Sequence, residues 1–247
     1  TVQAGDSDTD GIGLVGGIDL NGGTIKDSAG NDASTAFTSP STANILVDGI
    51  IPTITNITPP ANGLYKLGDN LDFQFTFSEN VNVNTAFGTP RVALAVGSST
   101  VYATYLSGSG TNTLTFRYTV QSGHLDTDGI AINSPIQLNG GTIKDGAGND
   151  ADLNFTVWPL SGVQIDGVAP TISNLGKPAD GTYPANKRLD FRIFFDSPIN
   201  VSGGVPSLLI RVGNQLREAR YLWGSGGNYL VFGYRCLLYT SPSHETG

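Results

Sequence analysis

The acidic residues near the start of the chain have the spacing of a cation-binding loop. Asp6, Asp8 and Asp10 alternate with small polar residues and are followed by Gly11. Three carboxylates at every second position can direct oxygen atoms at one hard cation such as Ca²⁺, and the glycine allows a sharp turn. The loop is not an EF-hand, because Gly17 occupies the twelfth position, where an EF-hand has a bidentate glutamate. The alternative interpretation is an acidic, solvated turn.

The same stretch occurs a second time at a constant spacing. Residues 9–33 contain TDGI and then LNGGTIKDSAGNDA, and residues 127–151 contain TDGI and then LNGGTIKDGAGNDA, an offset of 118. A fixed period of this kind indicates tandem repeats. In the second copy His124 replaces Asp6, and histidine is a poor Ca²⁺ ligand, so that copy keeps Asp126 and Asp128.

The period divides the chain into one whole repeat and two incomplete ones. Residues 1–49 are the C-terminal half of a first partial unit, residues 50–167 are a complete unit, and residues 168–235 are the N-terminal part of a third unit. The segments IPTITNITPP and APTISNLGKP open the complete and third units. Residues 236–247 match no part of a repeat and resemble the translated adapter sequence that closes some environmental reads, so we expect a non-native tail.

Short alternating segments in the complete unit predict an all-β fold. Apolar residues recur at every second position within 71–77, 91–96 and 113–120, and 100–106 is a further strand-like run with Val101, Tyr102 and Tyr105. We also expect a strand near Ile54 and a hairpin with a strand through Ile136 and Ile143, a turn at 146–149 and a second strand at 151–157. About seven short strands are typical of an immunoglobulin-like β-sandwich. The predicted core consists of Ile54, Leu71, Phe73, Phe75, Leu94, Leu114, Phe116, Tyr118 and Ile136.

The alternating direction of the strands predicts where acidic groups gather. Asp126, Asp128 and Asp166 belong to the pole where the chain leaves the complete unit, and Asp196 of the third unit stands near the place that Glu79 holds. Close carboxylates repel one another unless a cation neutralises them, and Ca²⁺ takes six to eight oxygen ligands. We therefore expect Ca²⁺ at both junctions between units. The predicted ligands are Asp6, Asp8, Asp10, Asp48 and Glu79 at the first junction, and Asp126, Asp128, Asp166 and Asp196 at the second.

The links between units are short and end in proline. Residues 48–52 read DGIIP and residues 166–170 read DGVAP. Proline fixes its own φ and forces the preceding residue into an extended conformation. A short, extended link clamped by an ion predicts a stiff rod, which would bend at Gly49 or Gly167 without the ion.

Composition and motifs exclude several classes of function. The net charge is −8, and residues 1–167 hold 16 Asp and Glu against 5 Lys and Arg, which argues against a nucleic-acid partner. No window of 18 consecutive apolar residues occurs, so we expect no membrane insertion by this segment. The motifs H-E-x-x-H, G-x-S-x-G and the P-loop are absent, which predicts a non-catalytic chain without a catalytic cofactor. The only cysteine, Cys236, excludes an intrachain disulfide.

Lys144 and Asn149 raise the alternative of an intramolecular isopeptide bond. Both residues lie in one predicted hairpin, so such a bond would close only a short loop. We expect instead a solvated lysine next to a turn.

The joined pattern resembles a known class of repeat. The segments TDGI and LNGGTIKDxAGNDA, then V/I-D-G-x-x-P-T-I and FSENVNV, are similar to bacterial Ig-like repeats of large secreted or surface proteins over residues 1–235. Such repeats stand in tandem in calcium-dependent adhesins and exported enzymes. The resemblance implies a cadherin-like spacer, extracellular or at the bacterial cell surface. Its implied partners are neighbouring repeats and a cell-surface or glycan ligand elsewhere in the parent protein.

The alternative function is a carbohydrate-binding or accessory module of an exported multidomain enzyme. Trp158 and Trp223 are the aromatic side chains that could stack on a sugar. Neither tryptophan recurs at the matched position of another unit, which favours half-buried edge residues.

Overall fold

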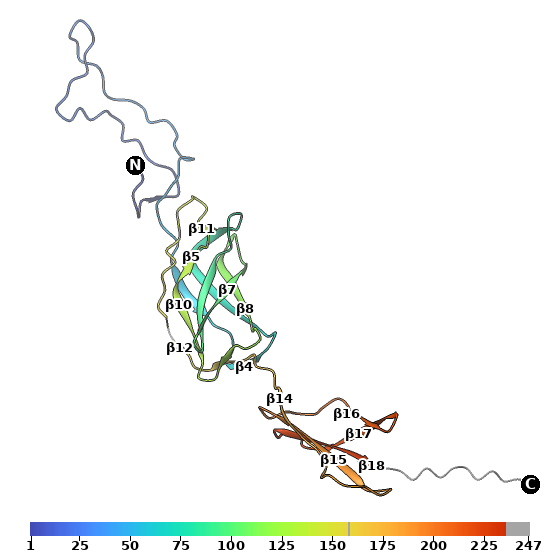
Figure 1. Cartoon of the computed structure of the whole chain (residues 1–247). Coiled ribbons are helices and arrows are strands. Elements are labelled where there is room, and N and C mark those ends of the chain that lie inside the picture. Colours follow the sequence, from blue (N-terminus) through green and yellow to red (C-terminus); the bar gives the residue numbers. More distant parts are fainter. Residues whose placement is uncertain (158, 236–247) are drawn as a thin grey trace, which may run out of the picture. The chain divides into compact units, whose positions relative to one another are not determined.

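The computed structural model describes residues 1–157 and 159–235 (Figure 1). Within these ranges the regular elements are strands, and they contain no helix long and apolar enough to cross a membrane. The chain divides into two compact parts, Thr1–Val168 and the chain from Ala169 onward. Trp158 and the predicted tail at 236–247 lie outside the described residues.

The complete unit is a β-sandwich-like arrangement of mainly antiparallel strands. One path of paired strands runs β11-β5-β8-β7-β6-β10-β12, with β3 paired to β5, and a smaller sheet has the order β4-β13-β9. In that smaller sheet β13 is parallel to β4 and antiparallel to β9. The strands are β3 (Ile54–Thr58), β4 (Gly63–Lys66), β5 (Asn70–Asn84), β6 (Arg91–Val96), β7 (Ser99–Ser107), β8 (Thr111–Thr119), β9 (Leu125–Asp126), β10 (Ile130–Gln137), β11 (Thr142–Lys144), β12 (Pro159–Leu160) and β13 (Val163–Asp166).

One hydrophobic core holds these strands together. In β5 every second residue from Leu71 to Phe77 is buried, because the alternate side chains of a strand point to one face. Phe75 packs edge-to-face on Phe116 of the neighbouring β8, with ring centroids 5.4 Å apart. Of the predicted core residues, eight are buried, which confirms them, and Ile54 is half-buried against the same core.

The predicted hairpin differs from the structure in both of its strands. The first strand is broken between β10 and β11, where Asn139 and Gly140 have φ of 49° and 92°. Residues 151–157 form no strand of their own, although Leu153 and Phe155 pack on the core. Their backbone is held instead by single contacts, such as the Phe155 amide with Ser134 Oγ at 3.0 Å. The alternating apolar residues of 151–157 therefore reflect burial of their side chains on the core, without pairing of this segment to a neighbouring strand.

The third unit contains one five-stranded antiparallel sheet of order β14-β15-β18-β17-β16. Its core is small, and Ile193, Ala219, Leu230 and Phe232 are buried at its centre. The strand β16 lies at an edge of the sheet. The strands are β14 (Ile172–Gly176), β15 (Arg188–Phe195), β16 (Ser207–Val212), β17 (Gln215–Trp223) and β18 (Tyr229–Arg235).

The first partial unit has little regular structure. Its only strands in the described chain are β1 (Ser7–Asp8) and β2 (Val47–Asp48), which pair with each other. At the following link, the Gly49 amide donates to the Asp6 carbonyl at 2.7 Å, and the Gly49 carbonyl accepts from the Gly5 amide at 2.8 Å. Gly167 makes the equivalent hydrogen bonds with His124 and Gly123. Both glycines are thus held by backbone hydrogen bonds at their amide and their carbonyl.

Candidate metal centre

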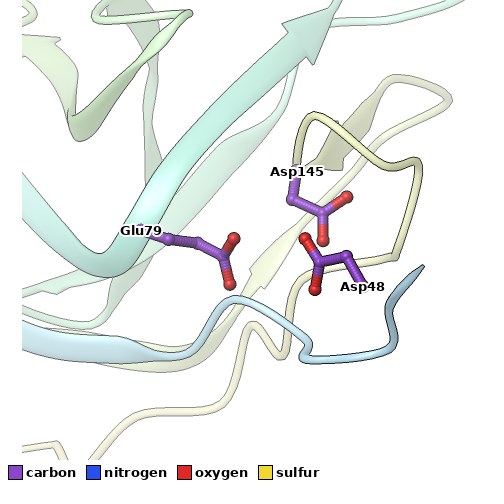
Figure 2. Close-up of side chains that lie close together, drawn as sticks. All are labelled: Asp48, Glu79 and Asp145. Carbon is purple, nitrogen blue, oxygen red and sulfur yellow. The ribbon is translucent and has the colours of Figure 1, made fainter. Parts of the chain in front are cut away.

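Three carboxylates meet beside the first link. Asp48, Glu79 and Asp145 each offer an oxygen atom, and these atoms all lie within 4.8 Å of one another (Figure 2). Asp48 ends β2, Glu79 belongs to β5, and Asp145 follows β11 directly. Asp48 is exposed, Glu79 is half-buried and Asp145 is buried. The cluster therefore joins the link to two segments of the complete unit.

Asp145 is held by the turn that follows it. Its Oδ1 accepts hydrogen bonds from the backbone amides of Gly148 and Asn149, at 2.7 and 2.8 Å. Its Oδ2 accepts from Asn149 Nδ2 at 2.7 Å. Aspartate favours such turns because its short side chain reaches the backbone amides that follow it. Gly148 has φ of +101°, a conformation that glycine adopts without a steric penalty.

Asn149 also ties the link to this turn. Its Nδ2 donates to the Asp48 carbonyl at 2.9 Å, across 101 residues of chain, as well as to Asp145. Asp48 Oδ1 accepts from the Ile50 amide at 3.1 Å, which orients the exposed carboxylate at the start of the link. One amide side chain thus fixes the spacing between two of the three acids.

An irregularity in β5 positions Glu79. The pairing of β5 with β8 shifts register between Thr76 and Val81, and Glu79 lies within that interval. The neighbouring Ser78 pairs with Thr53, donating its amide to the Thr53 carbonyl at 2.8 Å and accepting the Thr53 amide at Oγ at 3.1 Å. Within the described residues, no hydrogen bond or ion pair engages the Glu79 carboxylate, so its oxygen atoms are free to bind a cation.

The ionised form of Glu79 is placed unfavourably without a cation. Burial raises the pKa of Glu79, and the negative charges of Asp48 and Asp145 raise it further. For Asp145 burial acts in the same direction, but hydrogen bonds from Asn149 and from the Gly148 and Ala147 amides outweigh it and lower the pKa. Across the ranges 1–157 and 159–235, no salt bridge involves any of the three acids.

Lys144 does not neutralise the cluster, although it precedes Asp145 in sequence. Its Nζ pairs with Asp150 at 2.7 Å and donates to the Gly148 carbonyl at 3.2 Å. The side-chain amide of Asn149, the other residue considered for an isopeptide bond, is occupied by Asp145 and Asp48.

The three aspartates of the N-terminal loop lie outside the cluster. Asp6 Oδ2 accepts the Gln3 amide at 2.7 Å, and Asp8 Oδ1 accepts the amides of Asp10 and Gly11, at 3.3 and 2.6 Å. Asp8 nevertheless lines the same open groove of about 450 Å³ as Asp48 and Glu79. In the structure Asp6 and Asp8 shape a turn, and of the acids predicted for the first junction only Asp48 and Glu79 belong to the cluster.

Of the acids predicted for the second junction, Asp126, Asp166 and Asp196 have local partners. Asp126 is buried, and its two oxygens accept the amides of Gly129 and Gly97, each at 2.7 Å. Asp166 Oδ1 accepts the Val168 amide at 3.1 Å, and Asp128 is exposed.

Asp196 caps the Thr171 amide at 2.9 Å, as Ser78 caps Thr53 in the complete unit. The equivalent of Asp196 is therefore Ser78, and the residue in the place of Glu79 is Ser197. His124, which replaces Asp6, contacts the Tyr118 hydroxyl through Nδ1 at 2.5 Å.

Sequence reasoning missed Asp145, although a signal for it existed. The motif KDxAGND occurs twice, and Asp27 in the first copy makes the same contacts with Asn31 as Asp145 makes with Asn149. The pairing of β11 with β5, with Lys144 opposite Asn82, then brings this motif to the side of Glu79. That pairing joins segments far apart in sequence, and the spacing of the acids alone does not reveal it.

Comparison with family models and with curated proteins finds no match for this sequence.

Proposed function

We propose that this chain consists of Ig-like tandem repeats that act as non-catalytic spacers in an exported bacterial surface adhesin, and that Ca²⁺ stiffens the junctions between repeats. The observation that supports this is the cluster of Asp48, Glu79 and Asp145, which draws one acid from the link and two from the complete unit. The repeated sequence and its resemblance to bacterial Ig-like repeats support the rest of the proposal.

The donor set suits Ca²⁺. Hard oxygen ligands are those that Ca²⁺ prefers, and it accepts irregular arrangements of six to eight of them. Asp48, Glu79 and Asp145 would supply three carboxylates, with water or main-chain oxygens completing the shell. A bound cation would replace mutual repulsion by attraction to a common centre.

The mechanical effect follows from where Asp48 lies. Gly49, which directly follows it, is held by hydrogen bonds at its amide and its carbonyl. Ile50 donates its amide to Asp48 Oδ1 at 3.1 Å and accepts from Asn149 Nδ2 at 3.4 Å, so the segment of Ile50 and Ile51 depends on side chains of the cluster and its turn. An ion that holds Asp48 against Glu79 and Asp145 would restrain this two-residue segment from its N-terminal side. Without the ion we expect bending there, beyond the glycine that sequence reasoning identified.

Some of the cluster residues recur at equivalent positions of the other units. Asp166 occupies the position of Asp48 at the next link, and Asp27 occupies the position of Asp145 in the first partial unit. Ser197 replaces Glu79 in the third unit, so a site there would have weaker ligands. The Ca²⁺ sites proposed for the second junction, with Asp126, Asp128, Asp166 and Asp196, stay a separate prediction.

Calorimetric titration of Ca²⁺ into the chain tests the proposal. We expect binding that is weakened at least tenfold by Asp48→Asn or Asp145→Asn, because each removes a charged ligand. Asp180→Asn removes the same charge from an exposed residue of the third unit and serves as the control. Absence of binding heat, or equal weakening by the control, would contradict a Ca²⁺ site at this cluster.

A carbohydrate-binding module is the second candidate function. Trp223 is 48 % exposed and packs edge-to-face on Tyr229, with ring centroids 5.5 Å apart. An exposed, oriented indole is the kind of surface on which sugars stack. A glycan array probed with the chain and with Trp223→Ala would support this function if binding occurs and the variant loses it.

A further inference from the structure

One of the two arginines of the complete unit has no acidic partner within the described residues. The unit, residues 50–167, holds four Lys and Arg against nine Asp and Glu, a net charge of −5. Arg117 pairs with Asp72, whereas Arg91 makes no salt bridge with any residue that the structure describes. The charge of Arg91 is therefore not compensated inside a unit that is rich in carboxylates.

Arg91 lies in the middle of a polar row on the outer face of the sheet. On β6 it is opposite Gln137 of β10 on one side and Thr104 of β7 on the other. The intervening residues of β6, Val92 and Leu94, are buried in the core, so Arg91 belongs to the opposite face. Thr104 is exposed, and Arg91 and Gln137 are half-buried, so a ligand can reach the row from solvent.

Two neutral neighbours hold the guanidinium of Arg91 in place. Its Nε donates to Gln137 Oε1 at 3.1 Å, and its Cζ lies 3.9 Å from the centroid of the Tyr102 ring. A cation over an aromatic face is stabilised without losing its charge. Among residues 1–157 and 159–235, no acceptor engages the two Nη atoms, which form a planar fork of donors.

Arg117 shows how such a fork pairs when an acid is present. It lies opposite Asp72 across β8 and β5, and its Nε and Nη2 donate to the two carboxylate oxygens, each at 2.6 Å. Arg91 has Gln137 opposite it instead, and Gln137 accepts from Nε only and brings no charge. A carboxylate from outside the chain would give Arg91 the bidentate pairing that Asp72 gives Arg117.

The third unit forms the same hairpin without this arrangement. By the register of β16 with β17, Ser207 takes the place of Arg91. In the same register, Glu218 takes the place of Tyr102. Both hairpins contain six residue pairs, so the fold forms with or without the stacked arginine. Formation of the sheet therefore does not account for the pair of Arg91 and Tyr102.

Neutral polar groups surround the guanidinium on this face. Thr104 is beside Arg91 in the row, and Asn133 of β10 is opposite Ala93, the next residue of β6 on the same face. Tyr102 is 37 % exposed. Hydroxyl and amide groups both donate and accept hydrogen bonds, as the hydroxyl groups of a sugar do. One positive charge among neutral donors and acceptors matches a sugar with one carboxylate.

We propose that Arg91 and Tyr102, with Thr104 and Asn133 beside them, bind a sugar that carries a single carboxylate, such as a sialic or uronic acid. The two Nη atoms of Arg91 donate to the carboxylate, and the neutral groups bind the ring hydroxyls. The net charge of −5 around the site repels a polyanion more than it repels one carboxylate. The ligand is therefore a sugar with an isolated charge, and not a nucleic acid, a sulfated polymer or an acidic protein segment.

This site is separate from the acidic cluster and from Trp223. Arg91 belongs to β6, whereas the acids of the cluster come from β2, β5 and the turn after β11. The site gives the complete unit a ligand of its own, and it does not rest on the spacer function or on Ca²⁺. Measurements in the presence of a chelator therefore test it independently of the proposed metal centre.

Nuclear magnetic resonance titration of the 247-residue chain tests the proposal, because it detects weak binding and locates it. Two pairs of probes each differ by a carboxylate: sialyllactose against lactose, and methyl glucuronide against methyl glucoside. We expect at least one acidic probe to shift the side-chain Nε–H signal of Arg91 and the amide signals of Tyr102 and Thr104. The neutral member of that pair should leave these signals unchanged.

Four variants separate the built site from charge alone. Arg91→Gln should abolish binding, and Arg91→Lys should weaken it at least tenfold, because lysine keeps the charge but lacks the planar fork. Tyr102→Leu should also weaken binding, because the guanidinium loses its stacking partner. Lys66→Gln removes the same charge from an exposed residue of β4, and Trp223→Ala removes the other candidate sugar contact; both should bind as the unaltered chain does. Circular dichroism verifies that each variant folds.

Several results would overturn the proposal. These are the absence of a shift with both acidic probes, equal shifts with the neutral probes, unchanged affinity of Arg91→Gln or Arg91→Lys, or equal weakening by Lys66→Gln. A glutamate-rich peptide that shifts the same signals at lower concentration than the sugars would assign the site to an acidic protein segment. Binding that only Trp223→Ala removes would support the carbohydrate-binding module and contradict the site at Arg91.

Discussion

Replacing Glu79 by glutamine should have opposite effects with and without Ca²⁺. Without the cation, the Glu79 carboxylate is half-buried beside two other acids, and within the described residues no hydrogen-bond donor compensates it. Its raised pKa means that Glu79 gives up its proton less readily in the folded protein than in the unfolded chain, so the ionised form costs stability at neutral pH. Glutamine removes that cost while keeping the size of the side chain.

The magnitude follows from the spacing of the charges. Two unit charges 4.8 Å apart repel by about 1 kcal/mol in water and by about 3.5 kcal/mol at the effective dielectric constant of a protein surface. Asp48 is exposed and screened, so the lower figure applies to its pair with Glu79. We expect Glu79→Gln to stabilise the cation-free protein by about 1–2 kcal/mol.

With saturating Ca²⁺ the sign reverses. A ligand at a hundred times its Kd stabilises the folded state by about 2.7 kcal/mol, and the variant should lose most of this because it binds the ion more weakly. Acidification of the cation-free protein should act like the substitution. As pH falls through the folded-state pKa of Glu79, the repulsive charge is neutralised and stability rises.

Urea denaturation of the 247-residue chain, with Ca²⁺ and with chelator, measures both effects on the transition of the complete unit. Glu218→Gln is the matched control, since Glu218 is exposed on β17 of the third unit. If Glu79→Gln destabilises the cation-free protein, or if Ca²⁺ stabilises the variant and the unaltered chain equally, then repulsion within the cluster is not what the ion relieves.

Three further predictions concern the turn and the link. Asn149→Ala should destabilise the complete unit by about 1–3 kcal/mol in urea denaturation, because the buried Asp145 loses one hydrogen-bond donor. The equivalent Asn31→Ala in the exposed first partial unit should have no measurable effect. Gly148→Ala should lower the free energy of unfolding by about 1–2 kcal/mol, because φ at this position is +101°. Gly146→Ala is the control: an added Cβ meets open space at both positions, but φ of Gly146 is not positive, so its stability should not change. Equal losses of stability in the same denaturation assay would contradict this prediction. Chelation of Ca²⁺ should shorten the maximum dimension of the chain in small-angle scattering; an unchanged dimension would count against an ion-stiffened link.

The sequence predicted the strands whose apolar residues alternate and which pair with neighbours in sequence. The range 91–96 was predicted as it occurs in β6, and the buried Phe73, Phe75 and Phe116 were identified, since alternation and burial have the same cause in such strands. Alternation also occurs at 151–157, where side chains pack on the core but the backbone makes only scattered hydrogen bonds, and there the predicted strand is wrong.

The acidic cluster was predictable only in part. Asp48 and Glu79 were assigned to the first junction from the order of strands, which is a local inference. Asp145 requires that β11 pair with the far end of β5, a contact between residues about sixty apart that neither period nor composition determines. In contrast, the spacing of Asp6 and Asp8 that suggested a cation site has another cause. Both carboxylates accept hydrogen bonds from backbone amides of the turn in which they lie.

The parallel pairing of β4 with β13 has a consequence for how the complete unit would carry force. The chain forms β3 before β4 and leaves the unit just after β13, and four residue pairs, from Val163 with Gly63 to Asp166 with Lys66, join β4 to β13. Tension that reaches β4 through β3, and β13 through the outgoing link, would pull these two strands in opposite senses along their length. Their hydrogen bonds would then be strained together and would have to break at once, whereas a hairpin pulled from its open end yields one bond at a time. Such a unit would resist stretching in proportion to the length of this short overlap.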